Sequence, residues 1–238
     1  MTHQSPSAVA ATHFVEAKGR CLACRTFGSG APIVLSVRFR GTMDSWAPLF
    51  LDSLAEQGFE VTTFDYSGLG QSTGSPTYSP SSPAADAIDL ITALELGKVG
   101  IAGWSIGGMA AQVVLATAPG LVSQAVPIAT TPPDKIAKAG DPLFYEMAKR
   151  ENDFEDFVSL FFEPTSPTSR AAAEVLAKRL KQPRADVSPS VSYEWAGHQL
   201  GESPRNAAFP ADAALAELKA TSIPILHLGR DHDIVFPS

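Results

Sequence analysis

Short apolar runs and amphipathic stretches alternate along most of this chain. Continuous apolar runs are typical of strands buried on both faces, whereas apolar positions three and four residues apart are typical of helices. Turn residues separate several of these stretches: Lys18-Gly19 lies between the first two, and a Ser/Pro-rich loop is expected at 76–83. Strands are predicted at 13–17, 20–27, 33–37, 60–66, 99–102, 124–129 and 223–228, and helices at 46–57, 85–96 and 109–116.

This alternation predicts an α/β fold. Strands that alternate with helices form a mostly parallel sheet, and the intervening helices cover both of its faces. A chain of 238 residues is long enough for one large domain or for one domain with an insertion.

The alternation of predicted strands and helices stops between residues 132 and 205. Helix-like stretches separated by prolines occupy this segment, at 142–150, 154–162, 169–180 and 192–200, with no strand predicted among them. We therefore expect a helical lid at 132–205, inserted into an α/β core made of 1–131 and 206–238. Some lid aromatics are candidates to line a substrate pocket, although more of them are expected to pack the lid on itself: Phe144, Tyr145, Phe161, Phe162, Tyr193 and Trp195.

The stretch Gly103-Trp104-Ser105-Ile106-Gly107 joins a predicted strand to a predicted helix. A serine on such a sharp turn is lifted out of the sheet, and the flanking glycines avoid clashes in the turn. The N-terminus of the next helix favours a nearby oxyanion. Ser105 is therefore a candidate nucleophile; the plainer alternative is a glycine-rich turn that lets helix and strand pack closely.

A serine nucleophile needs a base, an orienting acid and donors to the oxyanion. The acid candidate is Asp233, in the loop after the last predicted strand, with Asp231 as the second choice. Either aspartate could instead be an ordinary turn former. The backbone N–H groups of Ile106 and Phe39 are the candidate oxyanion donors.

These features together resemble the α/β-hydrolase superfamily, in particular its lid-bearing serine hydrolases. The resemblance rests on 103–108, on the acid loop, on Gly41-Thr42-Met43-Asp44-Ser45-Trp46 and on 64–72, which is similar to the family's D-x-x-G-x-G-x-S turn. It implies a cofactor-free enzyme with the triad order Ser, Asp, His. Hydrolysis of a small ester or lactone is the expected reaction, with C–C bond hydrolysis or perhydrolysis as variants.

The chain departs from the family pattern before the oxyanion residue. Val37-Arg38 stands where the family usually has His-Gly, although a backbone N–H donor survives this change. An arginine near the pocket mouth is compatible with an anionic substrate. The favoured interpretation is that Arg38 and Arg40 form structural ion pairs, with Asp44 or Asp65 as partners.

A second departure concerns the histidine. The family implies a base in a loop that follows the acid after one further strand, whereas the sequence given ends at Ser238. We expect a C-terminally shortened hydrolase, nearly inactive in this form, whose triad histidine is not in the chain. The histidines present fit poorly: His3 and His13 are N-terminal, His227 is expected to pack in the core, His232 lies beside the acid, and His198 alone could approach Ser105 from the lid.

Charge and composition narrow the partners. The net charge is −7, with no basic run to neutralise phosphates, which argues against nucleic acids and anionic membrane surfaces. Neither a bilayer-spanning run nor a signal peptide is evident, so a cytoplasmic location is expected. Cys21 and Cys24 lack a second Cys/His pair and are expected to be small core residues, with no metal. The partner is thus a small-molecule substrate, and the oligomeric state is not predicted.

One alternative comes from a different functional class. A fold does not imply its usual function, and an aromatic lid can close on a small apolar ligand without chemistry. The missing histidine favours such a non-catalytic ligand-binding protein, whereas the nucleophile turn and the acid favour the hydrolase.

Overall fold

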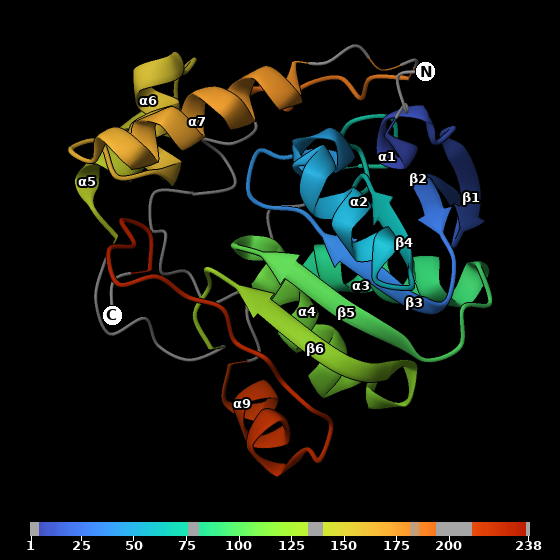
Figure 1. Cartoon of the computed structure of the whole chain (residues 1–238). Helices are drawn as coiled ribbons and strands as arrows, with labels where there is room; N and C mark the ends of the chain where they lie inside the picture. Colours follow the sequence, from blue (N-terminus) through green and yellow to red (C-terminus); the bar gives the residue numbers. More distant parts are fainter. Residues whose placement is uncertain are drawn as a thin grey trace.

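One mixed sheet forms the centre of the molecule (Figure 1). The computed structural model describes residues 5–75, 81–132, 140–181, 184, 186–193 and 211–236, and within them the strand order is β1-β2-β4-β3-β5-β6. The strands are β1 (His13–Ala17), β2 (Arg20–Gly28), β3 (Ala31–Ser36), β4 (Phe59–Phe64), β5 (Val99–Trp104) and β6 (Val122–Ile128).

The sheet changes from antiparallel to parallel at β4. Strands β1 and β2 form a hairpin, and β2 pairs antiparallel with β4. The pairs β4–β3, β3–β5 and β5–β6 are parallel. Strands β3 and β5 therefore end at the same edge of the sheet. The loop that follows β3 and contains Phe39 is thus a neighbour of the turn at Ser105, which follows β5.

Helices cover both faces of the sheet (Figure 1). Helix α2 (Pro48–Glu56) packs on β4 and β2, with the short α1 (Pro6–Val9) against it, whereas α3 (Ser81–Ala93) and α4 (Ile106–Thr117) cover the other face. Helix α9 (Ala211–Ala220) packs against α4. The largest fully buried side chains lie between these layers and include Phe64, Leu22, Leu35, Met43, Leu51, Leu90 and Ile101.

A second group of helices lies beyond the edge of the sheet where β3 and β5 end (Figure 1). It comprises α5 (Pro142–Met147), α6 (Phe154–Phe161) and α7 (Pro167–Leu180). Aspartate or serine side chains cap all three at their N-termini, through Asp141, Asp153 and Ser166. None of the described helices is long and apolar enough to cross a membrane.

The predicted α/β fold is confirmed, with local differences. Helix α3 begins at Ser81, inside the predicted Ser/Pro loop, whose residues 76–80 lie outside the described part. The predicted strand at 223–228 makes only isolated parallel bridges to β6, Ala125 to Ile225 and Ile128 to Leu228. Its apolar side chains Ile225, Leu226 and Leu228 are exposed.

Close backbone packing explains the glycines that flank Ser105. A Cβ atom on Gly107 would overlap the carbonyl oxygens of Ser36 and Val37 at the end of β3. A Cβ atom on Gly103 would overlap the carbonyl of Gly107. Only glycine allows the start of α4 to approach β3 and β5 this closely.

Replacing Gly107 with alanine should therefore destabilise the fold. Backbone atoms cannot move aside as a flexible side chain can, so we expect Gly107→Ala to lower the free energy of unfolding by about 2 kcal/mol or more. Gly120→Ala is the matched control, since a Cβ there meets no atom within 4 Å. Urea unfolding of the two variants measures the difference; equal stabilities would contradict the close approach.

Candidate active site

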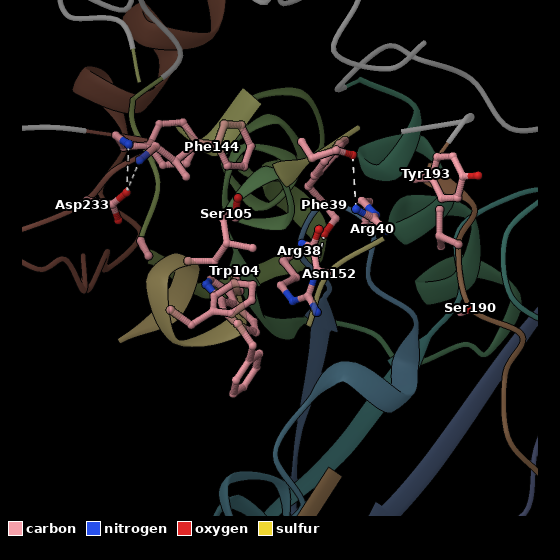
Figure 2. Close-up of a pocket in the computed structure, with 18 of the residues that line it drawn as sticks. Arg38, Phe39, Arg40, Trp104, Ser105, Phe144, Asn152, Ser190, Tyr193 and Asp233 are labelled. Atoms are coloured by element: carbon pink, nitrogen blue, oxygen red, sulfur yellow. Dashed lines mark hydrogen bonds between the residues drawn. The ribbon is translucent and has the colours of Figure 1, made fainter. Parts of the chain in front are cut away.

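Ser105 lies at the junction of β5 and α4 in a strained backbone conformation. Its φ and ψ angles are 60° and −120°, a region that non-glycine residues rarely adopt and that costs about 1–3 kcal/mol. The Ser105 N–H donates to the carbonyl of Ile128 at 2.9 Å, and the Ser105 carbonyl accepts from Gly108 and Met109 at 2.9 and 3.2 Å. These bonds hold the sharp turn in place, and the Ser105 side chain projects into a cavity (Figure 2).

The cavity has a volume of about 800 Å³ and lies between the sheet edge and helices α5 and α6. This volume is within the usual range for small-molecule sites. Figure 2 shows Ser105 with Asp233 to one side and with Arg38 and Phe39 to the other. Aromatic side chains contribute much of the wall: Phe39, Trp104, Phe144, Phe157, Phe161, Tyr193 and Phe236.

The aromatic side chains of the predicted lid divide between the cavity and the packing among the helices. Phe144, Phe161 and Tyr193 line the cavity. The ring of Tyr145 packs edge-on against Phe144, and that of Phe162 packs against Phe157. Trp195 lies outside the described residues.

Asp233 lines this cavity, whereas Asp231 is exposed and does not. The Asp233 side chain is 7% exposed, and its Oδ1 accepts from the backbone N–H groups of Val235 and Phe236 at 2.8 and 2.9 Å. Its Oδ2 lies 3.3 Å from the Arg230 Nε. Asp233 is thus a turn former, as one interpretation of the sequence had it, and it also faces the same cavity as Ser105.

Arg230 is a residue that the sequence analysis missed. It lies three positions before Asp233 and lines the cavity, and its Nη2 donates to the carbonyl of Leu160 in α6 at 3.2 Å. Asp141 before α5 also donates, through its backbone N–H, to the carbonyl of Ile234. The acid loop is therefore bound to the helices across the cavity, and its position depends on them.

The two candidate oxyanion donors lie on either side of the close contact between β3 and α4. Phe39 lines the cavity in the loop after β3. Ile106 is the first residue of α4, where backbone N–H groups have no acceptor within the helix. Both positions agree with a donor role.

Arg40 connects the loop of Phe39 to helix α5. Its φ angle is 55°, and its Nη1 donates to the carbonyls of Met147, Ala148 and Arg150 at 3.3, 3.2 and 2.9 Å. Carbonyls at the C-terminal end of a helix lack partners within the helix and attract cations. Arg40 is therefore a cap for α5 that also fixes the loop of Phe39.

The expected ion pairs of Arg38 and Arg40 are wrong within the described residues. Asp44 pairs instead with Arg25 and, at 2.8 Å, with Arg184. Asp65 accepts from the Ser188 hydroxyl at 2.6 Å and from the backbone N–H groups of Met43 and Gln71. The carboxylates of Asp44 and Asp65 are therefore already paired, and they connect Arg184 and Ser188 to the core.

No described histidine lines the cavity. His232 is 85% exposed, and its Nδ1 lies 3.3 Å from a carboxylate oxygen of Glu163. His227 is exposed, so the prediction that it packs in the core is wrong. The segment 223–228 that carries it is itself mostly exposed. His198 and His3 lie outside the described residues, and His13 belongs to the edge strand β1.

The two cysteines lie in different surroundings. Cys24 is buried in the core, and burial raises the pKa of its thiol to about 11. Cys21 is half-buried, and its thiol donates to Glu16. Within the described part of the chain, no cluster of three or more His, Cys, Asp or Glu side chains could hold a metal ion.

Comparison with known proteins identifies the family. A sequence model of the alpha/beta hydrolase fold matches residues 39–237. This match spans most of the chain, which therefore belongs to the α/β-hydrolase fold family. The matched region includes the Ser105 turn, the helices α5–α7 and the Asp233 loop.

A curated relative matches less than half of this chain. A Mycobacterium tuberculosis protein, BpoC, provisionally named as a non-heme bromoperoxidase, is 31% identical over 103 residues, which are 43% of this chain. The match spans 39% of BpoC, so less than half of that relative is represented.

Solved structures share the fold at lower identity. An alpha/beta hydrolase fold protein from Chitinophaga pinensis has a TM-score of 0.70 and 21% identity, over 94% of this chain and 90% of its own. An esterase from Exiguobacterium antarcticum has a TM-score of 0.68 and 20% identity, over 95% and 84% of the two chains. At these identities, the similarity shows a shared fold.

The Arg40 contacts predict a local effect on α5. Removing the guanidinium in Arg40→Met takes away the donor that the carbonyls of Met147, Ala148 and Arg150 share, and we expect a loss of about 1–2 kcal/mol in unfolding free energy. Hydrogen exchange should accelerate at 142–150 more than in β5. Arg170→Met, which breaks an exposed pair with Glu155, is the control and should change stability by less than about 1 kcal/mol. Unchanged exchange at 142–150 would contradict the capping role.

Proposed function

We propose that this protein is a serine hydrolase that acts on a small ester or lactone. The observation that carries the proposal is the strained Ser105 turn, which faces the same 800 Å³ cavity as the buried carboxylate of Asp233. Strain at a non-glycine residue persists only where the surrounding structure enforces it, and it is concentrated at functional sites.

In the proposed reaction, the Ser105 Oγ attacks the substrate carbonyl and passes its proton to a histidine base. Asp233 orients that imidazole and stabilises its protonated form. The N–H groups of Ile106 and Phe39 stabilise the oxyanion of the tetrahedral intermediate. As this intermediate collapses, the bond to the leaving alcohol breaks and the imidazolium gives its proton to the alcohol oxygen. Water, deprotonated by the same imidazole, then attacks the acyl-Ser105 ester and releases the acid. We propose that the histidine is not in this chain, which supplies the nucleophile, the acid and the oxyanion donors.

Helices α5–α7 are the proposed lid. Phe144 of α5 packs on Phe39 with ring centroids 6.1 Å apart, and Phe161 of α6 packs on Trp104 at 5.4 Å. These contacts place apolar surface over Ser105, and exclusion of water strengthens the electrostatic interactions inside a site. The relatives named as an esterase and a bromoperoxidase support hydrolysis, with perhydrolysis as a variant.

The central role of Ser105 predicts a specific kinetic behaviour. A site without one triad member typically retains only ~10³–10⁴-fold acceleration over water. We therefore expect weak hydrolysis of p-nitrophenyl acetate by the chain, and a severalfold increase on adding imidazole, which can replace a missing side-chain base.

Two variants decide this prediction. Ser105→Ala should abolish both the basal rate and the response to imidazole, whereas His198→Ala should change neither. Strong activity that does not respond to imidazole and is lost in His198→Ala would show that the base is His198, against the proposal.

The choice of acid predicts a difference between two neighbouring aspartates. Asp233→Asn should lower the imidazole-assisted rate at least tenfold, because an amide stabilises an imidazolium poorly. Asp231→Asn, at an exposed position, should leave that rate unchanged. The measurement is the p-nitrophenyl acetate rate at saturating imidazole, and the opposite ranking would assign the acid to Asp231.

A non-catalytic ligand-binding protein is the second candidate. The observation in its favour is that no described residue lining the cavity is a histidine. This alternative predicts that small esters bind but that no hydrolysis depends on Ser105, with or without imidazole.

A further inference from the structure

The Arg38 side chain lies in the cavity wall beside the candidate oxyanion loop (Figure 2). Its guanidinium carbon is 5.4 Å from the ring centre of Trp104 and 4.8 Å from that of Phe161. Both rings hold the planar group in a defined orientation through cation–π contacts. The two rings supply no carboxylate or carbonyl oxygen to the N–H groups of the guanidinium.

This positive charge has little compensation. The Nη1 donates to the carbonyl of Phe39 at 2.8 Å, while the buried Nε has no acceptor within the described residues. No carboxylate in that part of the chain pairs with Arg38. Burial, together with the nearby charge of Arg40, lowers the pKa of Arg38 to about 10, so the side chain remains cationic at neutral pH.

The carboxylates around the cavity are occupied or exposed. Asp233 is bound to Arg230 and to two backbone N–H groups. Asp153 caps α6 through the N–H of Asp156, and both Asp153 and Glu151 are exposed. A buried cation without a partner is costly, and a ligand anion that supplies the missing charge binds through strong charge-assisted hydrogen bonds.

We propose that Arg38 binds a carboxylate group of the substrate. The ligand class is an ester or lactone that carries a free carboxylate, with its scissile carbonyl at Ser105 and its carboxylate toward Trp104 and Phe161. The ester part of this assignment rests on the proposed hydrolase function. The preference for an anion depends on the charge of Arg38 and not on hydrolysis, so it can be tested without turnover.

Binding is measured in Ser105→Ala protein, which prevents hydrolysis. Monomethyl glutarate and dimethyl glutarate have similar shapes and differ in one negative charge, and NMR titration gives the dissociation constant of each. We expect the monoester to bind about tenfold more tightly or better, as hydrogen bonds to a charged group allow. Adding Arg38→Met should reduce this ratio to near one, and Arg38→Lys should retain part of it.

Arg170→Met, which removes a surface cation in the first turn of α7, is the control and should leave the ratio unchanged. A ratio near one in protein that retains Arg38 would overturn the proposal. So would a preference that survives in Arg38→Met. If Arg38→Met does not fold, the Arg38→Lys ratio, compared with that of the Arg170→Met control, decides the question.

A kinetic arm separates this proposal from the proposed function. Hydrolysis of mono-p-nitrophenyl glutarate is compared with that of p-nitrophenyl butyrate in the presence of imidazole. An Arg38-dependent binding preference without any Ser105-dependent hydrolysis would refute the hydrolase while supporting the anion site. Hydrolysis of both esters without an Arg38-dependent preference would refute the anion site while supporting the hydrolase.

Discussion

The close approach of α4 to the end of β3 is the constraint on which the site depends. Gly107 lies against the carbonyls of Ser36 and Val37, where any Cβ atom would overlap them. This contact fixes the turn that holds Ser105 in its strained conformation. It also brings the loop carrying Phe39 beside the first N–H groups of α4. Ser105 and both candidate oxyanion donors are therefore positioned by one packing contact between backbones.

The remaining parts of the site are held by contacts that cross the cavity. Arg40 binds the carbonyls of Met147 and Ala148 at the end of α5, and Arg230, in the loop of Asp233, binds the Leu160 carbonyl in α6. The loops that carry Asp233 and Phe39 thus share the same group of helices as support.

Much of the core and the Ser105 turn could be predicted from the sequence, because they depend on local patterns. The apolar run before Ser105, the flanking glycines and the following small-residue helix are all adjacent in the chain. The partners of Asp44 could not be predicted in the same way: Arg184 is 140 residues away, and the expected pairs with Arg38 and Arg40 were wrong. The pairing of Arg230 with Asp233 could have been predicted, since the two residues are three positions apart in the sequence. The exposure of His227 depends on what covers 223–228, which no local pattern reveals.

The most direct test of the account is the site of acylation by p-nitrophenyl acetate. With no oriented base, as proposed, deacylation is slow, so the acyl-enzyme should accumulate and be visible by mass spectrometry of the intact protein and of its peptides. The account predicts one acetyl group on the peptide that contains Ser105, and none there in Ser105→Ala. Acetylation confined to surface lysines, or identical labelling of the two proteins, would contradict the assignment of Ser105 as the nucleophile.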